Sequence, residues 1–165
     1  VVAVSMQNVS KHTPELKLVQ AKDLETLLAA TERFPGRSDV MFVYARAILQ
    51  KNKSQCAEAL PFFDKALALD DRFVLCRVEK AKCLEEVEGP ESAAVEMKRA
   101  IDLNPYSFST RREVARLIKR HPSVDFTVFK GCDDWTKADW VVGDFENIEA
   151  LIDSNLDLVE MTTKE

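Results

Sequence analysis

Two histidines and a run of aspartates are the residues of this chain that could do chemistry. Neither His12 nor His121 has a cysteine, serine or carboxylate at the spacing of a catalytic motif. A histidine acts as a general base only beside the group whose proton it takes. The four aspartates between residues 133 and 144 could suggest a divalent-cation site, but they lack the glycine and the twelfth-position glutamate of a calcium loop. We therefore expect no catalytic residues, no metal site and no cofactor, and predict that the chain is not an enzyme.

Charged residues are distributed unevenly along the chain. From Asp133 to Glu165 there are ten acidic residues against two lysines, so residues 1–132 carry +3 of the total net charge of −5. The densest basic cluster is Arg111, Arg112, Arg116, Lys119 and Arg120. Three interpretations remain open for it: a solvated helix face, a surface for an acidic peptide, or a contact for the chain's own acidic segment. We expect no nucleic-acid partner, because the sequence pI is about 5.2 and no known binding motif accompanies the cluster.

Cysteine usage and hydropathy bear on the compartment. The chain has 4 cysteines and no Cys-x-x-Cys pair, which predicts buried, reduced thiols in the cytoplasm or another reducing compartment. The first residue is not methionine, so an upstream targeting segment, for example a mitochondrial one, could have preceded it. No apolar run approaches the roughly 18 residues needed to span a bilayer, and we expect no direct membrane insertion by this fragment.

The elements that position these residues are expected to be helices. Only 4 glycines and 6 prolines interrupt the chain, and its apolar residues recur at helical spacing. Pro61 disfavours the helix predicted around it, because an interior proline costs about 3 kcal/mol unless the helix starts near Ala57 or bends. With Asp23 preceding the first helix and Ser38 as the N-cap of the second, we predict helices over residues 24–34, 38–51, 56–69, 72–87, 90–102, 107–119 and 144–160.

Small residues repeat along this helical region with a period of 34. The alanines in register are Ala47, Ala81 and Ala115, then Ala59 and Ala93, then Ala66 and Ala100. This period, with small residues at fixed offsets, is typical of stacked helix–turn–helix units. Over about residues 38–120 the chain resembles the tetratricopeptide repeat (TPR) family, whose small residues let the helices approach closely.

The resemblance implies an all-α fold, a TPR-like stack of antiparallel helix pairs closed by irregular C-terminal capping helices. We expect a loose arm over residues 1–13 and one helical domain over 14–165. Within that domain we expect a degenerate repeat (14–37), two TPR-like units (38–71 and 72–105), the first helix of a third unit (106–121) and an acidic capping segment (122–165).

The resemblance also implies a function. In this family the first helix of each unit lines a groove that binds other proteins, and we predict a non-catalytic scaffold or adaptor that binds a protein or an acidic peptide. The partner-binding residues implied here are Tyr44, Lys51, Val78, Lys82, Arg112, Arg116 and Lys119. The chain departs from the family where Arg46, Arg77 and Lys80 replace large apolar residues, which predicts that the first helices are rotated or displaced.

The C-terminal aromatic residues support an alternative function. Phe126, Phe129, Trp135 and Trp140 would either cap the helical stack or form an exposed patch for another protein. In the second case the chain would be a self-assembly module, a homo-oligomer that an N-terminal segment could tether to an organelle membrane. Its self-association residues would be Trp135, Trp140, Phe145 and Leu151.

Overall fold

The protein is described by a computed structural model, which defines residues 23–131 and 152–153. The described residues form six α-helices and one short 3-10 helix, and none of them is in a strand. This confirms the predicted all-α fold class. The elements are α3 (Leu24–Arg33), α4 (Ser38–Lys51), α5 (Cys56–Leu69), α6 (Val74–Val87), α7 (Pro90–Leu103), α8 (Phe108–Arg120) and η1 (Thr127–Phe129).

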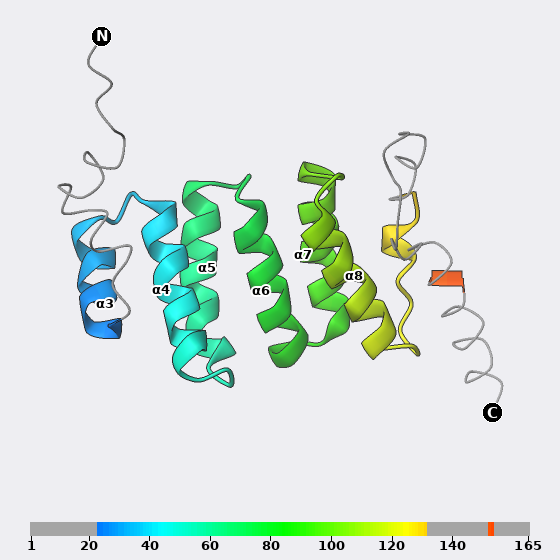
Figure 1. The fold of residues 1–165 in the computed structure, drawn as a ribbon, viewed down its shortest axis with the longest axis horizontal. Coiled ribbons are helices and arrows are strands. Elements are labelled where there is room, and N and C mark those ends of the chain that lie inside the picture. Colours follow the sequence, from blue (N-terminus) through cyan, green and yellow to red (C-terminus); the bar gives the residue numbers. More distant parts are fainter. Residues whose placement is uncertain (1–22, 132–151, 154–165) are drawn as a thin grey trace, which may run out of the picture. The chain divides into compact units, whose positions relative to one another are not determined.

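The chain divides into two compact units, residues 1–71 and residues 72–165. In the first unit, α4 and α5 form an antiparallel pair and α3 packs against α4 (Figure 1). In the second unit, α6 and α7 form an antiparallel pair, and both α8 and η1 pack against α7. The two pairs are the helical hairpins that the 34-residue register predicts.

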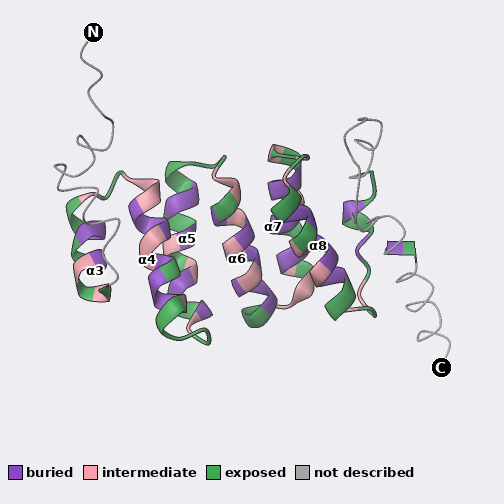
Figure 2. Cartoon of the chain, viewed as in Figure 1, coloured by how far each residue is buried: buried purple, intermediate pink, exposed green. Residues whose placement is uncertain are grey.

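The register alanines lie in the core. All seven are buried, and the side chains on the facing sides of each pair are buried with them (Figure 2). A small side chain at each of these points lets the two backbones approach closely. Larger apolar residues fill the remaining space, with Phe63 between the helices of the first pair and Met97 between those of the second.

Most helix boundaries agree with the sequence pattern to within two residues, and the caps explain two of them. The side chain of Asp23 accepts a hydrogen bond from the Thr26 amide at 3.0 Å. Ser107 caps α8 in the same way, with its hydroxyl accepting from the Thr110 amide. The expected cap at Ser38 is wrong: α4 begins at Ser38, and Arg37 stands at the N-cap position without a side-chain cap bond.

Pro61 lies inside α5, which begins at Cys56. The helix therefore starts about where the late start was expected, yet the proline is still interior. A proline at this position cannot donate to the Ala57 carbonyl, four residues earlier. Both Pro61 and Ala57 are exposed, so water can satisfy that carbonyl, which lowers the cost of the missing bond.

The end of the second unit is closed by aromatic residues. Phe126 and Phe129 are fully buried, with ring centroids 6.2 Å apart, and η1 packs against α7. These two rings therefore cap the helices of their unit and form no exposed patch. The arm over residues 1–13, the start of the degenerate repeat and the helix expected over residues 144–160, apart from 152–153, lie outside the described residues.

Candidate functional site

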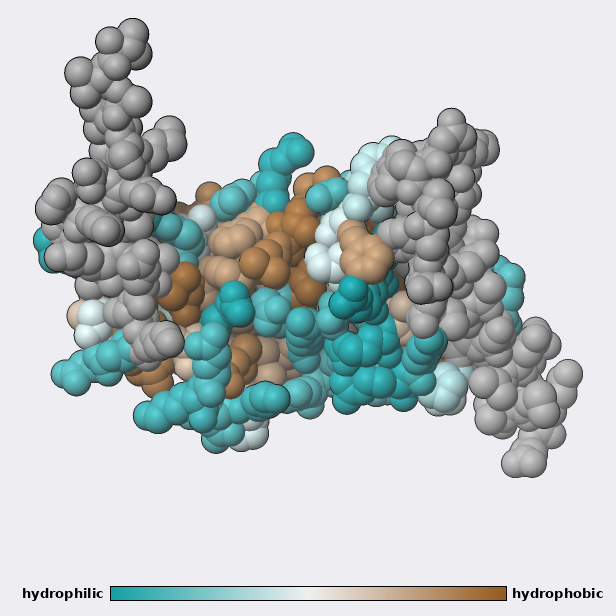
Figure 3. Space-filling view, in the orientation of Figure 1, coloured by the Kyte–Doolittle hydropathy of each residue, from teal (hydrophilic) through white to brown (hydrophobic). Residues whose placement is uncertain are grey.

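A groove of about 490 Å³ runs between α6 and α8 in the second unit. It lies between the first helix of one predicted repeat unit and the first helix of the next. Figure 3 shows apolar side chains gathered over the amino-terminal end of α6 and hydrophilic ones along α8. The groove is lined by Val74, Leu75, Val78, Glu79 and Lys82 from α6 and by Ser107, Ser109, Thr110, Arg112 and Glu113 from α8 and the residue before it.

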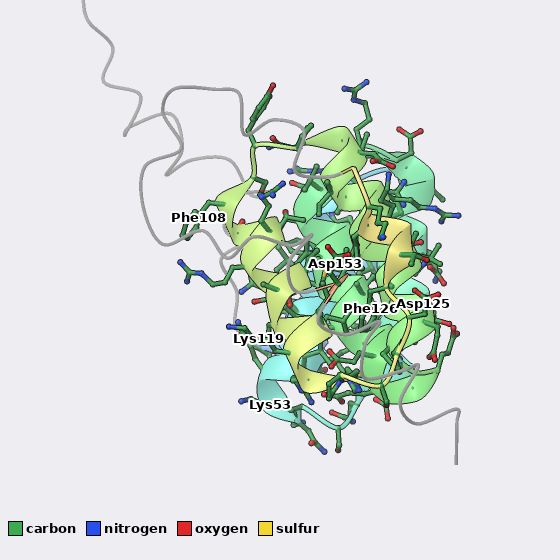
Figure 4. The ribbon with its side chains drawn as sticks, turned by 90° about the vertical axis from the view of Figure 1, so that its right-hand side faces the viewer. Lys53, Phe108, Lys119, Asp125, Phe126 and Asp153 are labelled. Carbon is green, nitrogen blue, oxygen red and sulfur yellow. The ribbon has the colours of Figure 1, made fainter. Side chains whose placement is uncertain are left out.

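One end of the groove is apolar. Val78 is buried in its floor, while the side chain of Leu75 is 47% exposed at its edge. Nearby on α8, the Arg112 guanidinium carbon lies 4.7 Å from the centre of the exposed Phe108 ring. Phe108 and Lys119 point outward on the same side of α8 (Figure 4). An arginine stacked on an aromatic ring beside apolar side chains is a common composition of protein-binding hot spots.

The other end of the groove is ionic. The Lys82 ammonium lies 3.1 Å from a Glu79 oxygen and 3.8 Å from a Glu113 oxygen. Arg116, one turn further along α8, donates to Glu113 over 2.7 Å. Of these pairs, Lys82–Glu113 joins α6 to α8, and the other two lie within one helix each.

A buried carboxylate continues this network below the groove. Glu85 on α6 lies 3.1 Å from Arg116, 3.2 Å from Arg120 and 2.8 Å from His121 Nε2. Its side chain is only 3% exposed. Burial by itself raises the pKa of Glu85, but the hydrogen bond with His121 and the charges of Arg116 and Arg120 outweigh burial and lower that pKa. Glu85 therefore stays ionised in the folded protein at neutral pH.

The basic cluster of α8 is not a single solvated face. Arg111 is buried, and Arg116 and Arg120 are paired with Glu85. Within the network, Glu79, Glu85 and Glu113 offset Lys82, Arg116 and Arg120. Arg112 differs, because none of the described carboxylates forms an ion pair with it. Arg112 is thus the groove-lining cation that these pairs leave available, and it stands beside the apolar end of the groove.

A second buried carboxylate pairs with the basic residues Arg77 and Lys80 of α6. Glu96 on α7 lies 3.0 Å from Arg77, 3.3 Å from Lys80 and 2.8 Å from Arg99. Burial raises the pKa of Glu96, but the charge of Lys80 and the Arg77 hydrogen bond outweigh it and lower that pKa. Arg77 and Lys80 therefore join α6 to α7 through ion pairs.

The residues predicted to bind a partner fall into three groups. Val78, Lys82 and Arg112 line the groove, and Arg116 and Lys119 continue along α8 beyond it. Tyr44 and Lys51 belong to α4 in the first unit, where the Tyr44 ring packs edge-on against Phe62 at 4.6 Å and Lys51 is exposed. The four residues predicted for self-association, Trp135, Trp140, Phe145 and Leu151, lie outside the described residues.

Sequence reasoning missed the roles of Glu85 and His121. The sequence shows no carboxylate at motif spacing from His121, because its partner Glu85 stands 36 residues earlier. The repeat register contained a usable signal. Glu85 and Lys119 are 34 residues apart, so Glu85 on α6 and the basic residues at the end of α8 occupy matching positions in successive first helices.

Two further properties concern the described part of the chain. No group of three or more histidine, cysteine or acidic side chains there is arranged to hold a metal ion. None of the described helices is both long enough and apolar enough to cross a membrane.

No protein-family model and no curated protein matches this chain.

Proposed function

We propose that this chain is a non-catalytic protein-interaction module, a TPR-like scaffold or adaptor that binds a peptide or protein segment in the α6–α8 groove. The observation that supports this most is the composition of the groove. Its apolar floor, its exposed leucine and the ring-stacked Arg112 lie together on two helices that ion pairs hold in place. Rigid walls lower the entropy cost of binding.

The groove also suggests the chemistry of its ligand. Leu75 and Val78 offer a contact for one apolar side chain, and Arg112 offers a charge-assisted hydrogen bond to one carboxylate. The remaining charges already compensate one another, so a densely acidic ligand gains little from them. We therefore propose a segment in which an apolar residue stands next to an acidic one.

The experiment compares two exposed apolar positions in the second unit. Leu75 at the edge of the groove is 47% exposed, and Val95 on α7 is 48% exposed. The full-length chain, Leu75→Asp and Val95→Asp are used as baits in quantitative affinity capture. Because an aspartate at position 75 places an unpaired charge on the apolar contact, we expect partners to lose about tenfold in enrichment with Leu75→Asp and to be retained by Val95→Asp.

Two results would count against the proposal. Equal loss with both variants would indicate a general effect of the substitutions, and equal retention would show that partners bind elsewhere. Far-UV circular dichroism of each bait verifies that it is folded. Light scattering on the same samples tests the alternative of self-assembly, because a module that binds itself has a mass that rises with concentration.

A further inference from the structure

The chain returns to the end of the second unit at residues 152 and 153. Ile152 is fully buried, and an oxygen of Asp153 lies 3.6 Å from the Lys130 ammonium, next to η1. Figure 4, which views the molecule from that end, labels Asp153 and the buried Phe126. The next residues along the chain therefore start beside η1, which packs against α7.

Residues 154–165 are long enough to reach the groove. Twelve extended residues span up to about 40 Å. The thirteen residues of α8 rise only about 20 Å along the helix axis. Starting beside η1, this segment can run along the whole length of α8 to the apolar end of the groove.

The composition of the same segment matches the groove. It reads Ser-Asn-Leu-Asp-Leu-Val-Glu-Met-Thr-Thr-Lys-Glu, with three carboxylates against one lysine. Asp157 stands between Leu156 and Leu158, which is the pairing of an apolar and an acidic side chain that Leu75, Val78 and Arg112 can accept. A segment of the same chain also binds at a high effective concentration, in the millimolar range for a short tether.

We infer that residues 154–165 occupy the α6–α8 groove of their own chain, with Leu156 and Leu158 against the apolar end and Asp157 paired with Arg112. This inference rests on the proposed function only in using the same groove as a peptide-binding surface. An outside partner must then displace the segment. The apparent affinity of the outside partner falls as the fraction of molecules whose groove holds residues 154–165 rises.

The test is photo-cross-linking within the full-length chain. A benzophenone amino acid replaces Ser109, an exposed residue that lines the groove, and in a control it replaces Val95 on α7. After irradiation, the monomer band is digested and the cross-linked peptides are identified by mass spectrometry. We expect cross-links from position 109 to residues 154–165, with a yield about tenfold above that from position 95.

A charge exchange makes the test specific. Arg112→Glu alone, or Asp157→Lys with Glu160→Lys alone, places like charges together and should lower the yield about fivefold. Combining all three substitutions restores an attractive pair and should restore most of the yield. Arg112 is exposed, so these variants should fold, and thermal unfolding of each one verifies this.

Three outcomes overturn the inference: equal yields from positions 109 and 95, cross-links that appear only between two chains, or a yield that Arg112→Glu leaves unchanged. The affinity capture separates this failure from failure of the proposed function. If partners depend on Leu75 but residues 154–165 do not cross-link to the groove, the proposed function is supported and the inference is wrong. If residues 154–165 cross-link but no partner depends on Leu75, the inference is supported and the proposed function is wrong.

Discussion

Glu96 illustrates how a buried carboxylate is stabilised in this protein. Its side chain is 5% exposed, and three cations from α6 and α7 surround it. Glu96→Gln removes the negative charge and leaves Arg77 and Lys80 close together and largely buried. We expect the free energy of unfolding to fall by about 2–3 kcal/mol, somewhat less than for a fully enclosed pair, because Arg99 is largely exposed.

Urea unfolding followed by far-UV circular dichroism measures this loss. The matched control is Glu91→Gln on the same helix, where the glutamate is exposed and its substitution should change the unfolding free energy by no more than about 0.5 kcal/mol. A Glu96→Gln variant as stable as the control would show that the three ion pairs contribute nothing net.

The two buried glutamates also predict a pH dependence. In the folded protein the pKa values of Glu85 and Glu96 are lowered from the ordinary 4.5. As pH falls, these two glutamates therefore take up protons in the unfolded chain before they do so in the folded protein. The contribution of the two ionised glutamates to the free energy of unfolding is therefore fully present above about pH 5. It is lost as pH falls through their lowered pKa values in the folded protein. The difference in unfolding free energy between the wild type and Glu96→Gln should shrink from pH 7 to about pH 3. A constant difference would contradict the lowered pKa of Glu96.

Among the elements, α5 carries an unfavourable residue that its surroundings tolerate. Pro61→Ala restores an amide that can donate to the Ala57 carbonyl and removes the clash of the proline ring. The gain is partly cancelled because proline also restricts the unfolded chain. We expect the first unit to be stabilised by about 1–2 kcal/mol, seen as a higher melting temperature.

Pro90 is the matched control for that substitution. It stands at the first position of α7, where no intrahelical bond is lost. Pro90→Ala should change stability by no more than about 0.5 kcal/mol. If Pro61→Ala lowers the melting temperature, the proline at position 61 is needed for packing or for the start of α5.

Helix positions could be predicted from the sequence because they depend on local signals. Asp23, the Gly89–Pro90 break and the apolar spacing each act within a few residues, and the 34-residue register fixes which helices pair. The cap of α4 could not be predicted this way. Ser38 has the right chemistry for an N-cap, but the helix begins at Ser38 itself, and the neighbouring Asp39 carboxylate accepts hydrogen bonds from the Arg37 guanidinium and the Val40 amide.

The candidate site was only partly predictable for a related reason. The register places Val78, Lys82 and Arg112 on neighbouring first helices, so their position along one groove follows from the repeat. Which cations remain available depends on long-range pairing, and Glu85 pairs with Arg116 and Arg120 from another helix. A count of basic residues along α8 therefore overestimates the charge that the groove presents.

At the scale of the whole molecule, the separation of charge along the sequence is the property that the proposed segment contact uses. Residues 133–165 carry ten acidic residues against two lysines, while residues 1–132 carry +3 of the total of −5. Attraction between exposed charges weakens as salt shortens the Debye length from about 10 Å at 0.1 M to about 3 Å at 1 M. Apolar contact does not weaken in this way.

Salt therefore separates the two contributions to the contact. Raising sodium chloride from about 0.05 M to about 0.5 M should lower the yield of the position-109 cross-link severalfold in the wild type. In Asp157→Asn the starting yield should be lower and the salt effect smaller, because that variant has lost the carboxylate facing Arg112. In Leu156→Ala with Leu158→Ala the yield should be lower at every salt concentration while the salt effect persists. A wild-type yield that does not change with salt would mean that Arg112 and the acidic segment do not meet, and apolar contact alone would then have to account for any cross-link.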